Sequence, residues 1–447
     1  MAPHPSAPPA DLSAKAPDDA PPYDRRRAWL ITVMIVAFMV INFADKAVLG
    51  LAAVPIMEEL DIDNSTYGLI SGSFSLLFSL SGLVVGFFSA RISSRTLLFV
   101  MTLLWAVAQL PVLIVAAVPT LIAGRVLLGA AEGPAASMSM HALYKWFPPD
   151  RRGLPSALQI SGAALGTLIS APVLTWLITD HGWRTSYAAL AVASATWALV
   201  WWRVGHDGPF DQSRPARSGA RTTTGTPLLP YRKLLLTGTV LGSISSAFGA
   251  AWALSLSHAW LPAYLRTELG MSPEATATLI SAVSAFSLVL LLTVAPLMDF
   301  LKSRGVSSRW SSGATQGIAV CVAGCAMAAF PFADSGVTRL LLIGLAFGTV
   351  AVAIPLHYMT VAEVAPPAQR GALFGIVAAT GTLPGLVAPF LTGHLIDAAD
   401  TAAAGYTTAF LIAALVMLLA GLLSVTGIHP ERDARRLGPD HCPSAPS

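Results

Sequence analysis

Apolar segments long enough to cross a lipid bilayer recur along almost the whole chain. A transmembrane helix needs about 20 mostly apolar residues, and only 11% of the residues are charged, against roughly 25% in soluble domains. The sequence therefore predicts an all-α membrane protein with twelve transmembrane helices. These spans are 28–54, 66–90, 96–117, 119–142, 153–178, 184–205, 234–262, 275–299, 312–332, 337–359, 370–396 and 404–427.

The basic residues predict the orientation of this bundle. Of the 27 lysines and arginines, Arg184, Arg266 and Arg339 lie in loops on one side, and Lys46 and Arg125 lie within spans. The other 22 lie on the side that carries both chain ends, which the positive-inside rule assigns to the cytoplasm. We therefore predict a multi-pass protein of a bacterial-type plasma (inner) membrane, with both termini cytoplasmic.

A polar segment divides the predicted spans into six and six. Residues 206–233 are rich in Pro, Gly, Arg and Thr and contain too little apolar surface to fold alone. We interpret them as a cytoplasmic linker between an N-terminal bundle (28–205) and a C-terminal bundle (234–428). Residues 1–27 are predicted to form a disordered cytoplasmic tail, and residues 429–447 a cytoplasmic C-terminal tail.

An internal repeat supports this division. PPDRRGLPSALQISGAALGTLISAP begins at Pro148, and PPAQRGALFGIVAATGTLPGLVAP begins at Pro366, 218 residues later. Both open with PPxxRG before a glycine-rich span that ends in Ala-Pro. Two six-helix halves in parallel repeat are implied, and such proteins bind substrate between the halves near the middle of the membrane.

Ionisable residues within the predicted spans are the strongest functional signal. Asp45 and Lys46 lie in the first span, and Arg125 and Glu132 in the fourth. Charged residues at this depth cost about 2.5–3.5 kcal/mol each on insertion scales, usually pair, and mark ion or substrate pathways. Arg125 and Glu132 are seven residues apart and share one helix face. If the two spans pack together, each charge can meet an opposite charge.

This group of charges suggests a mechanism. Its net charge is zero when all four residues are ionised and +1 when either carboxyl takes a proton. A protonated acid would release its basic partner to bind an anion, and loss of the anion would favour re-pairing and deprotonation. The alternative is a buried ion-pair cluster that only fixes helix packing.

A second pair of similar segments follows spans two and eight: GFFSARISSR and APLMDFLKSR. Both resemble the GxxxDRxGR loop of the major facilitator superfamily, in which this cytoplasmic loop helps to latch the two halves together. Ala90 stands where the family has an acid, and short inner loops are often basic for other reasons. The residues that match the motif are Gly86, Arg91, Arg95, Asp299 and Arg304.

Longer motifs resemble one branch of that superfamily, the anion:cation symporters. INFADKAVLGLAAVPIMEEL is similar to their first helix, and GRVLLGAAEGPAASMSMHALYKWFPPDRRG to their fourth helix and the loop after it. HGWRTSY and WLPAYL also fit. The resemblance implies proton coupling at Asp45 and Glu132 and substrate binding by Lys46 and Arg125. Lys46 replaces the usual arginine and lacks its bidentate fork.

Departures from sugar-acid carriers indicate the kind of anion. Those carriers commonly have Tyr and then Gln in the second helix, where this chain has Phe78 and Ser81, and Asn in the eleventh, where it has Thr382. Fewer hydroxyl-binding groups predict a less hydroxylated anion, such as an aromatic or short aliphatic carboxylate. His357 is a further substrate-binding candidate, with interhelical hydrogen bonding as its alternative role.

The sequence thus predicts a secondary active transporter that couples uptake of a small organic anion to protons by alternating access. We expect no metal and no cofactor besides the coupling proton, and a monomer in the lipid bilayer. The net charge of +3 gives no ground for nucleic-acid binding. HExxH, GxSxG and nucleotide-loop motifs are absent, so an enzyme is not expected. The alternative is metabolite or drug efflux by proton antiport.

Overall fold

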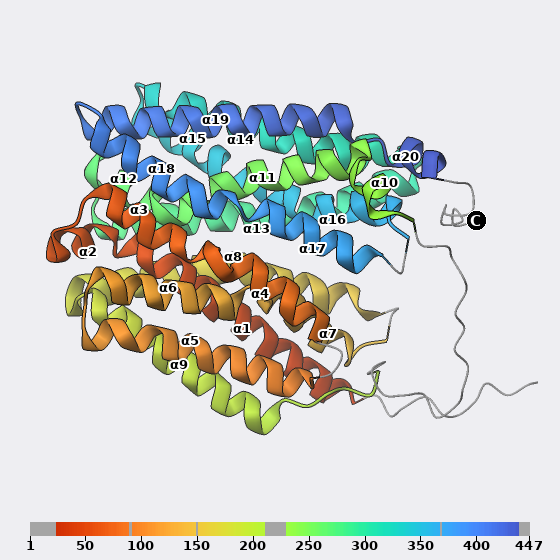
Figure 1. Cartoon of the computed structure of the whole chain (residues 1–447), viewed down its shortest axis with the longest axis horizontal. Coiled ribbons are helices and arrows are strands. Elements are labelled where there is room, and N and C mark those ends of the chain that lie inside the picture. The colour runs from red at the N-terminus through yellow and green to blue at the C-terminus, as the bar shows by residue number, and fades with distance from the viewer. Residues whose placement is uncertain (1–23, 89–91, 149–150, 211–228, 367–368, 438–447) are drawn as a thin grey trace, which may run out of the picture.

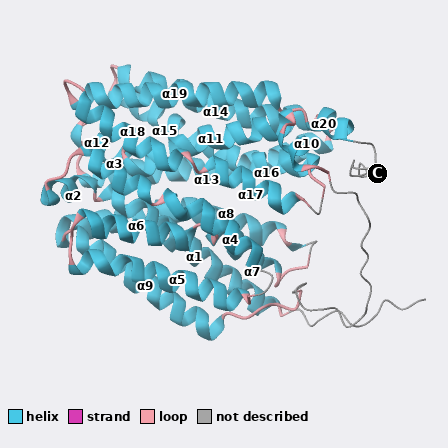
Figure 2. Cartoon of the chain, in the orientation of Figure 1, coloured by secondary structure: helices cyan, strands magenta, loops and turns pink. Residues whose placement is uncertain are grey.

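Every regular element in the described part of the chain is a helix (Figures 1 and 2). The computed structural model describes residues 24–88, 92–148, 151–210, 229–366 and 369–437. Within these ranges, nine helices or helix runs are long and apolar enough to cross a membrane. They are Arg25–Leu51 (α1), Ser94–Ile114 (α5), Gly153–His181 (α8), Gly238–Ala259 (α11), Pro273–Ser303 (α13), Arg309–Phe332 (η3, α14, η4), Gly336–Val364 (α15, η5, α16), Ala372–Ala398 (α17, α18) and Ala402–Gly427 (α19).

The other three predicted spans are also helical. The second consists of α3 (Asn64–Ser73) and α4 (Ser75–Phe88), and the fourth of α6 (Val118–Glu132) and α7 (Ala135–Tyr144). Each of these segments alone is too short to cross the hydrocarbon core. The sixth, α9 (Trp183–Val204), is one continuous helix, but Ser, Thr and Arg residues interrupt its apolar sequence. The predicted fold class is confirmed, with several of the spans broken into shorter helices.

Three of the helix breaks lie at a proline. Pro134 follows α6, Pro262 lies where α11 gives way to α12 (Leu261–Thr267), and Pro384 separates α17 (Arg370–Gly381) from α18 (Pro384–Ala398). Proline has no N–H to donate and clashes with the preceding turn, so it breaks a helix interior. Such breaks are found in transporters around the binding site.

The two halves of the chain form separate bundles that meet along one interface. In Figure 1 the red-to-yellow helices form one bundle and the green-to-blue helices the other. We call the end that carries Arg25 and α20 (Pro430–Leu437) the termini face, and the end that carries α2 (Ala53–Leu60) and α12 the opposite face. The repeat has a structural counterpart at the termini face. Arg152 Nε donates to the Phe147 carbonyl at 3.0 Å, and Arg370 Nε donates to the Ala365 carbonyl at 3.1 Å.

The predicted linker and tails lie partly outside the described residues. α10 (Tyr231–Leu235) overlaps the end of the predicted linker, while residues 1–23, 211–228 and 438–447 are not described. The predicted C-terminal tail contains the docked helix α20. The buried Asp433 carboxylate accepts hydrogen bonds of 2.8 Å from both the backbone N–H and the hydroxyl of Thr239. This contact anchors α20 to the start of α11.

Polar contacts hold the two halves together at the opposite face. The Asp397 carboxylate, at the end of α18, accepts hydrogen bonds from the backbone N–H groups of Asn64 and Ser65 at 3.2 and 2.7 Å. A carboxylate there also favours the positive end of the α3 dipole. Deeper in the interface, the Tyr67 hydroxyl donates to the Ala259 carbonyl at 3.0 Å.

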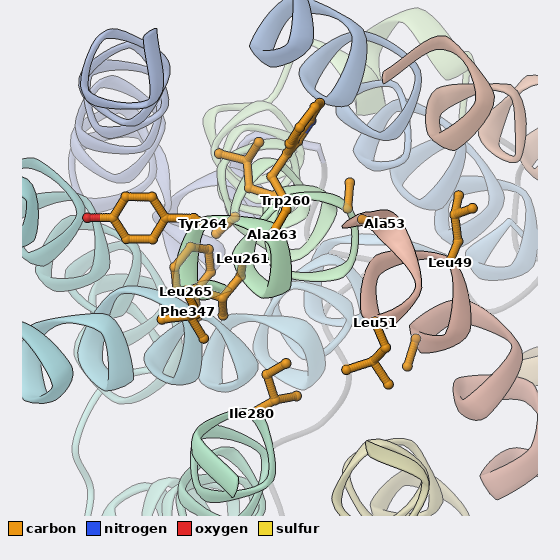
Figure 3. Close-up of a cluster of buried hydrophobic side chains, with 14 of the residues drawn as sticks. Leu49, Leu51, Ala53, Trp260, Leu261, Ala263, Tyr264, Leu265, Ile280 and Phe347 are labelled. Carbon is orange, nitrogen blue, oxygen red and sulfur yellow. The ribbon is translucent and has the colours of Figure 1, made fainter. Parts of the chain in front are cut away.

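A hydrophobic cluster seals the same end of the interface. Figure 3 shows Leu49 and Leu51 at the end of α1 near Trp260 and Leu261 at the start of α12, with Ile280 of α13 below them. All five are buried. Toward the termini face, α7 and α17 diverge in Figure 1. The described conformation is therefore closed at the opposite face.

A short link at the opposite face also fixes the end of the first span. Glu59 of α2 accepts hydrogen bonds from Trp183 Nε1 at 2.7 Å and Arg184 Nη1 at 2.8 Å. The hydrogen bond from Arg184 holds the pKa of Glu59 below its usual range. The Trp-Arg pair of the HGWRTSY motif therefore binds the acidic residue of α2.

Two glycines of α6 and its junction with α7 allow the second and fourth spans to touch. A Cβ at Gly129 would lie 1.8 Å from the Phe74 carbonyl oxygen, and one at Gly133 would lie 2.0 Å from the Phe78 carbonyl oxygen. Small residues at this spacing let membrane helices approach closely. The same approach brings Phe74 and Phe78 beside the charged residues of α6.

We expect Gly129→Ala to lower the free energy of unfolding by about 1–3 kcal/mol, the usual cost of overpacking. The added methyl group would overlap the Phe74 carbonyl. Thermal unfolding in detergent measures this effect. Gly344→Ala is the matched control, because open space surrounds the Cβ position in α15. Equal unfolding temperatures for wild type and Gly129→Ala would contradict the packing described here.

Candidate functional site

The site is built around an ion pair between the first and fourth spans. Lys46 Nζ lies 2.6 Å from Glu132 Oε2. The Glu132 side chain is fully buried, whereas that of Lys46 keeps 15% of its exposure. Lys46 Nζ also donates to the amide oxygen of Asn42, one helical turn earlier on α1. The ammonium is thus held by one carboxylate and one neutral oxygen, with part of its surface accessible.

Asp45 lies next to this pair and has different partners. Its carboxylate Oδ1 accepts a hydrogen bond of 2.9 Å from Gln109 Nε2 on α5. Arg125 Nη1 contacts the backbone carbonyl of Asp45 at 3.4 Å, rather than its carboxylate. The predicted tetrad is therefore assembled, but only its Lys46–Glu132 contact is a close ion pair. Arg125 contacts Asp45 through the backbone carbonyl, while Gln109 donates to one oxygen of the carboxylate.

Three aromatic rings surround the ammonium group. Lys46 Nζ lies 4.6 Å from the ring centroid of Phe43, 5.8 Å from that of Phe74 and 5.7 Å from that of Phe78. The Arg125 guanidinium lies 4.7 Å from the Phe74 ring. Cation–π contacts of this kind are worth roughly 0.5–2 kcal/mol each. Phe78, predicted from the sequence as a substrate-binding residue, does lie beside Lys46.

The C-terminal half contributes residues from α11 and from the break between α17 and α18. The rings of His258 and Phe43 are 6.5 Å apart across the interface between the halves. Thr382, another predicted substrate-binding residue, makes a close hydroxyl contact with Ser79 of α4. Both C-terminal residues therefore lie at the interface, and Thr382 contacts the residue that follows Phe78 on α4.

His357 is placed differently from the other predicted residues. It is buried in α16, and its ring lies 4.2 Å from that of its neighbour Tyr358. Its described contacts lie within the C-terminal half and do not include Lys46 or Arg125. A role in substrate binding stays a prediction for this residue.

The predicted loop motif lies at the termini face. Gly86 is near the end of α4, and Arg91 lies outside the described residues. The Arg95 guanidinium donates to the Trp202 carbonyl and lies 4.5 Å from the Trp202 ring, within its own half. Asp299 is exposed, and Arg304 lies 4.9 Å from the Phe300 ring. The latch stays a prediction, because the halves diverge at this face.

The candidate site contains five residues that were not selected from the sequence: Asn42, Gln109, Phe43, Phe74 and His258. Asn42 could have been found, since it stands one helical turn before Lys46, and Gln109 is the lone carboxamide of its apolar span. The aromatic residues gave no such signal, because phenylalanine is common in any membrane helix. His, Cys, Asp and Glu form no metal-binding group of three or more in the described ranges.

Comparisons with known proteins agree with this architecture. The model of the Major Facilitator Superfamily matches residues 34–350. A hexuronate transporter of Bacillus subtilis (strain 168) is 23% identical over 395 residues, which cover 88% of this chain and 92% of that protein. A D-galactonate transporter of Escherichia coli is 25% identical over 392 residues, 83% and 89% of the two chains.

The fold is also found among solved structures. The crystal structure of a D-xylose-proton symporter superposes with a TM-score of 0.73 at 17% identity, over 91% of this chain and 99% of that one. The relatives are transporters rather than enzymes. A family match over more than half of the sequence, on a chain folded into two helical bundles, shows that this protein belongs to the Major Facilitator Superfamily.

Proposed function

We propose that this protein couples the uptake of a small organic carboxylate to protons by alternating access. The observation that carries the proposal is the buried Lys46–Glu132 ion pair, which lies beside Asp45 at the interface between the halves. Relatives that transport hexuronate and D-galactonate support an organic anion as the substrate class.

The ion pair makes proton binding and anion binding depend on each other. A cation removed from water must keep an anionic partner, because leaving it unpaired costs about 3–5 kcal/mol. Protonation of Glu132 removes the partner of Lys46, and a substrate carboxylate then takes its place. One proton and one monocarboxylate together leave the net charge of the site unchanged. Neither ligand alone does so, which is the basis of symport.

Asp45 and Arg125 form the second part of the proposed site. Asp45 is the second proton carrier, and its buried carboxylate accepts a single described hydrogen bond, from Gln109. The Arg125 guanidinium lies over Phe74 together with Lys46. Because both cations contact the same Phe74 ring, they can bind one substrate carboxylate together. Arg125 thus supplies the bidentate fork that Lys46 lacks.

The aromatic rings favour an anion with an apolar body. Phe43, Phe74 and Phe78 present carbon atoms, rather than hydroxyl or amide groups, around Lys46. Apolar rings offer no partners to the hydroxyls of a sugar acid, and burying a polar group without a partner is unfavourable. We therefore infer an aromatic or short aliphatic carboxylate as the substrate.

The orientation of the chain decides which side of the membrane the described conformation faces. The basic residues of the termini face support a cytoplasmic location for that face in a bacterial-type cell, by the positive-inside rule. The described conformation, closed at the opposite face, then corresponds to a state that faces the cytoplasm. Efflux by proton antiport is the alternative, and the direction of flux in oriented vesicles separates the two.

We expect Glu132→Gln to abolish proton-driven accumulation while exchange of substrate across the membrane continues. A pH gradient of one unit supplies about 1.4 kcal/mol per coupled proton, enough for roughly tenfold accumulation of a monocarboxylate. Uptake of radiolabelled mandelate into liposomes at imposed pH gradients measures this, with protein-free liposomes as the blank. The variant should reach no more than the external concentration.

Glu363→Gln is the matched control for this experiment. Glu363 Oε1 lies 2.8 Å from Lys302 Nζ, so the control removes the charge of an ion pair at the termini face, away from the site. It should keep full accumulation. Full concentrative uptake by Glu132→Gln would defeat the proposed role of this residue.

Carboxylates with an apolar body should stabilise the protein more than sugar acids of equal charge do. We expect mandelate or phenylacetate to raise the unfolding temperature in detergent, and galactonate or glucuronate to raise it less, because the rings around Lys46 cannot bind their hydroxyls. Lys46→Met should remove the difference, because the anion loses its cation. Stronger stabilisation by the sugar acids would contradict the inferred substrate class.

A further inference from the structure

A second polar feature lies inside the N-terminal half, away from the interface between the halves. A cavity of about 10 Å³ lies between α5, α6 and α9 and is lined by Gln109, Arg125 and Tyr187, among others. A buried site needs about 10–15 Å³ of this kind of volume to hold one water molecule, together with two to four polar partners. The cavity therefore has the size of a single water.

Polar atoms without partners lie around this cavity. The Tyr187 hydroxyl and the Arg125 Nε are buried and have no hydrogen-bond partner in the described part of the chain. Buried donors and acceptors are nearly always paired with protein or ordered water. Two unpaired polar groups that border one small cavity, otherwise lined mostly by apolar residues, point to a water molecule between them.

We propose that this cavity is a binding site for one ordered water molecule, and that Tyr187, through this water, positions Arg125 and Gln109 on Asp45. This inference rests on the proposed role of Asp45 as a proton carrier. Gln109 borders the cavity and donates to the Asp45 carboxylate at 2.9 Å, and Arg125 borders it and contacts the Asp45 carbonyl. The water thus connects the two residues that set the environment of the acid.

The groups that face Asp45 come from several helices. Lys46 lies on α1, Arg125 and Glu132 on α6, Tyr187 on α9 and His258 on α11. Lys46 and Glu132 are paired with each other. His258 is oriented toward Phe43. Arg125 and Tyr187 both border the cavity; Arg125 keeps its Nη1 contact with the Asp45 carbonyl, whereas the Tyr187 hydroxyl has no partner in the described residues and can bind a water.

Tyr187→Phe removes one partner of the water. It keeps the aromatic ring, whose centroid lies 5.8 Å from that of Trp183. Gln109 and Arg125 then hold the ionised Asp45 less firmly, so the acid takes up its proton at higher pH. One lost hydrogen bond corresponds to a shift of about 0.4–1 pH unit in the midpoint of titration. Infrared difference spectra of the full-length protein measure this midpoint from the carboxyl stretching band, which Asp45→Asn identifies by its loss.

Tyr406→Phe is the matched control. Tyr406 is a buried tyrosine of α19, one residue beyond the 218-residue repeat offset from Tyr187, and is surrounded by Tyr264 and Phe410 rather than by the charged residues. Its replacement should leave the Asp45 midpoint unchanged. An unchanged midpoint in Tyr187→Phe, or an Asp45 band that does not titrate while the protein stays folded, would overturn the positioning role.

The water itself is tested in the wild-type protein, whether or not the variant folds. An experimental density map that resolves ordered solvent should show one peak within hydrogen-bond distance of Tyr187 Oη and Arg125 Nε. An empty or apolar-filled cavity would overturn the water site. Absence of proton-driven uptake in liposomes would instead refute the proposed function, and would leave the density and the titration of Asp45 to decide this inference.

Discussion

A charged group in a low-dielectric interior must be paired or coordinated, and this requirement organises the centre of the molecule. Lys46 satisfies it with Glu132 and Asn42, and with three aromatic rings that lie within 6 Å of its ammonium. Because the partners come from α1, α4 and α6, the first, second and fourth spans must pack closely for the ion pair to form. In the proposed mechanism the same requirement makes the pair responsive, since a substrate carboxylate replaces Glu132 once that residue is protonated.

Close helix packing is achieved by residues that lack bulk or break regular structure. Gly129 and Gly133 let the backbone of α4 approach α6, and the breaks at Phe74, Pro134 and Thr382 fall around the charged group. Free backbone groups are tolerated at membrane depth where they line a site inside the protein. On the opposite face, Asp397 and the cluster around Trp260 join the two halves, so the described conformation is closed there.

Much of this arrangement could be predicted because it depends on local patterns. Hydrophobic length identified the spans, and the distribution of basic residues gave their proposed orientation. The 218-residue repeat identified the two halves, and the matching contacts of Arg152 and Arg370 agree with it. Asp45, Lys46, Arg125 and Glu132 were recognisable because charge is rare within membrane spans. Gln109 and the phenylalanines were not, because neutral and aromatic residues carry no such signal.

The sequence by itself determined which charges must lie within the membrane and that the chain divides into two related bundles. Only the tertiary structure decided the pairing. Lys46 forms an ion pair with Glu132. Arg125 donates to the Asp45 carbonyl, and Gln109 donates to the Asp45 carboxylate. Likewise, Thr382 reaches the interface while His357 is buried within its own half. The reason is geometric: helical periodicity fixes which side chains share a face, but the partner across an interface depends on how the helices rotate and break.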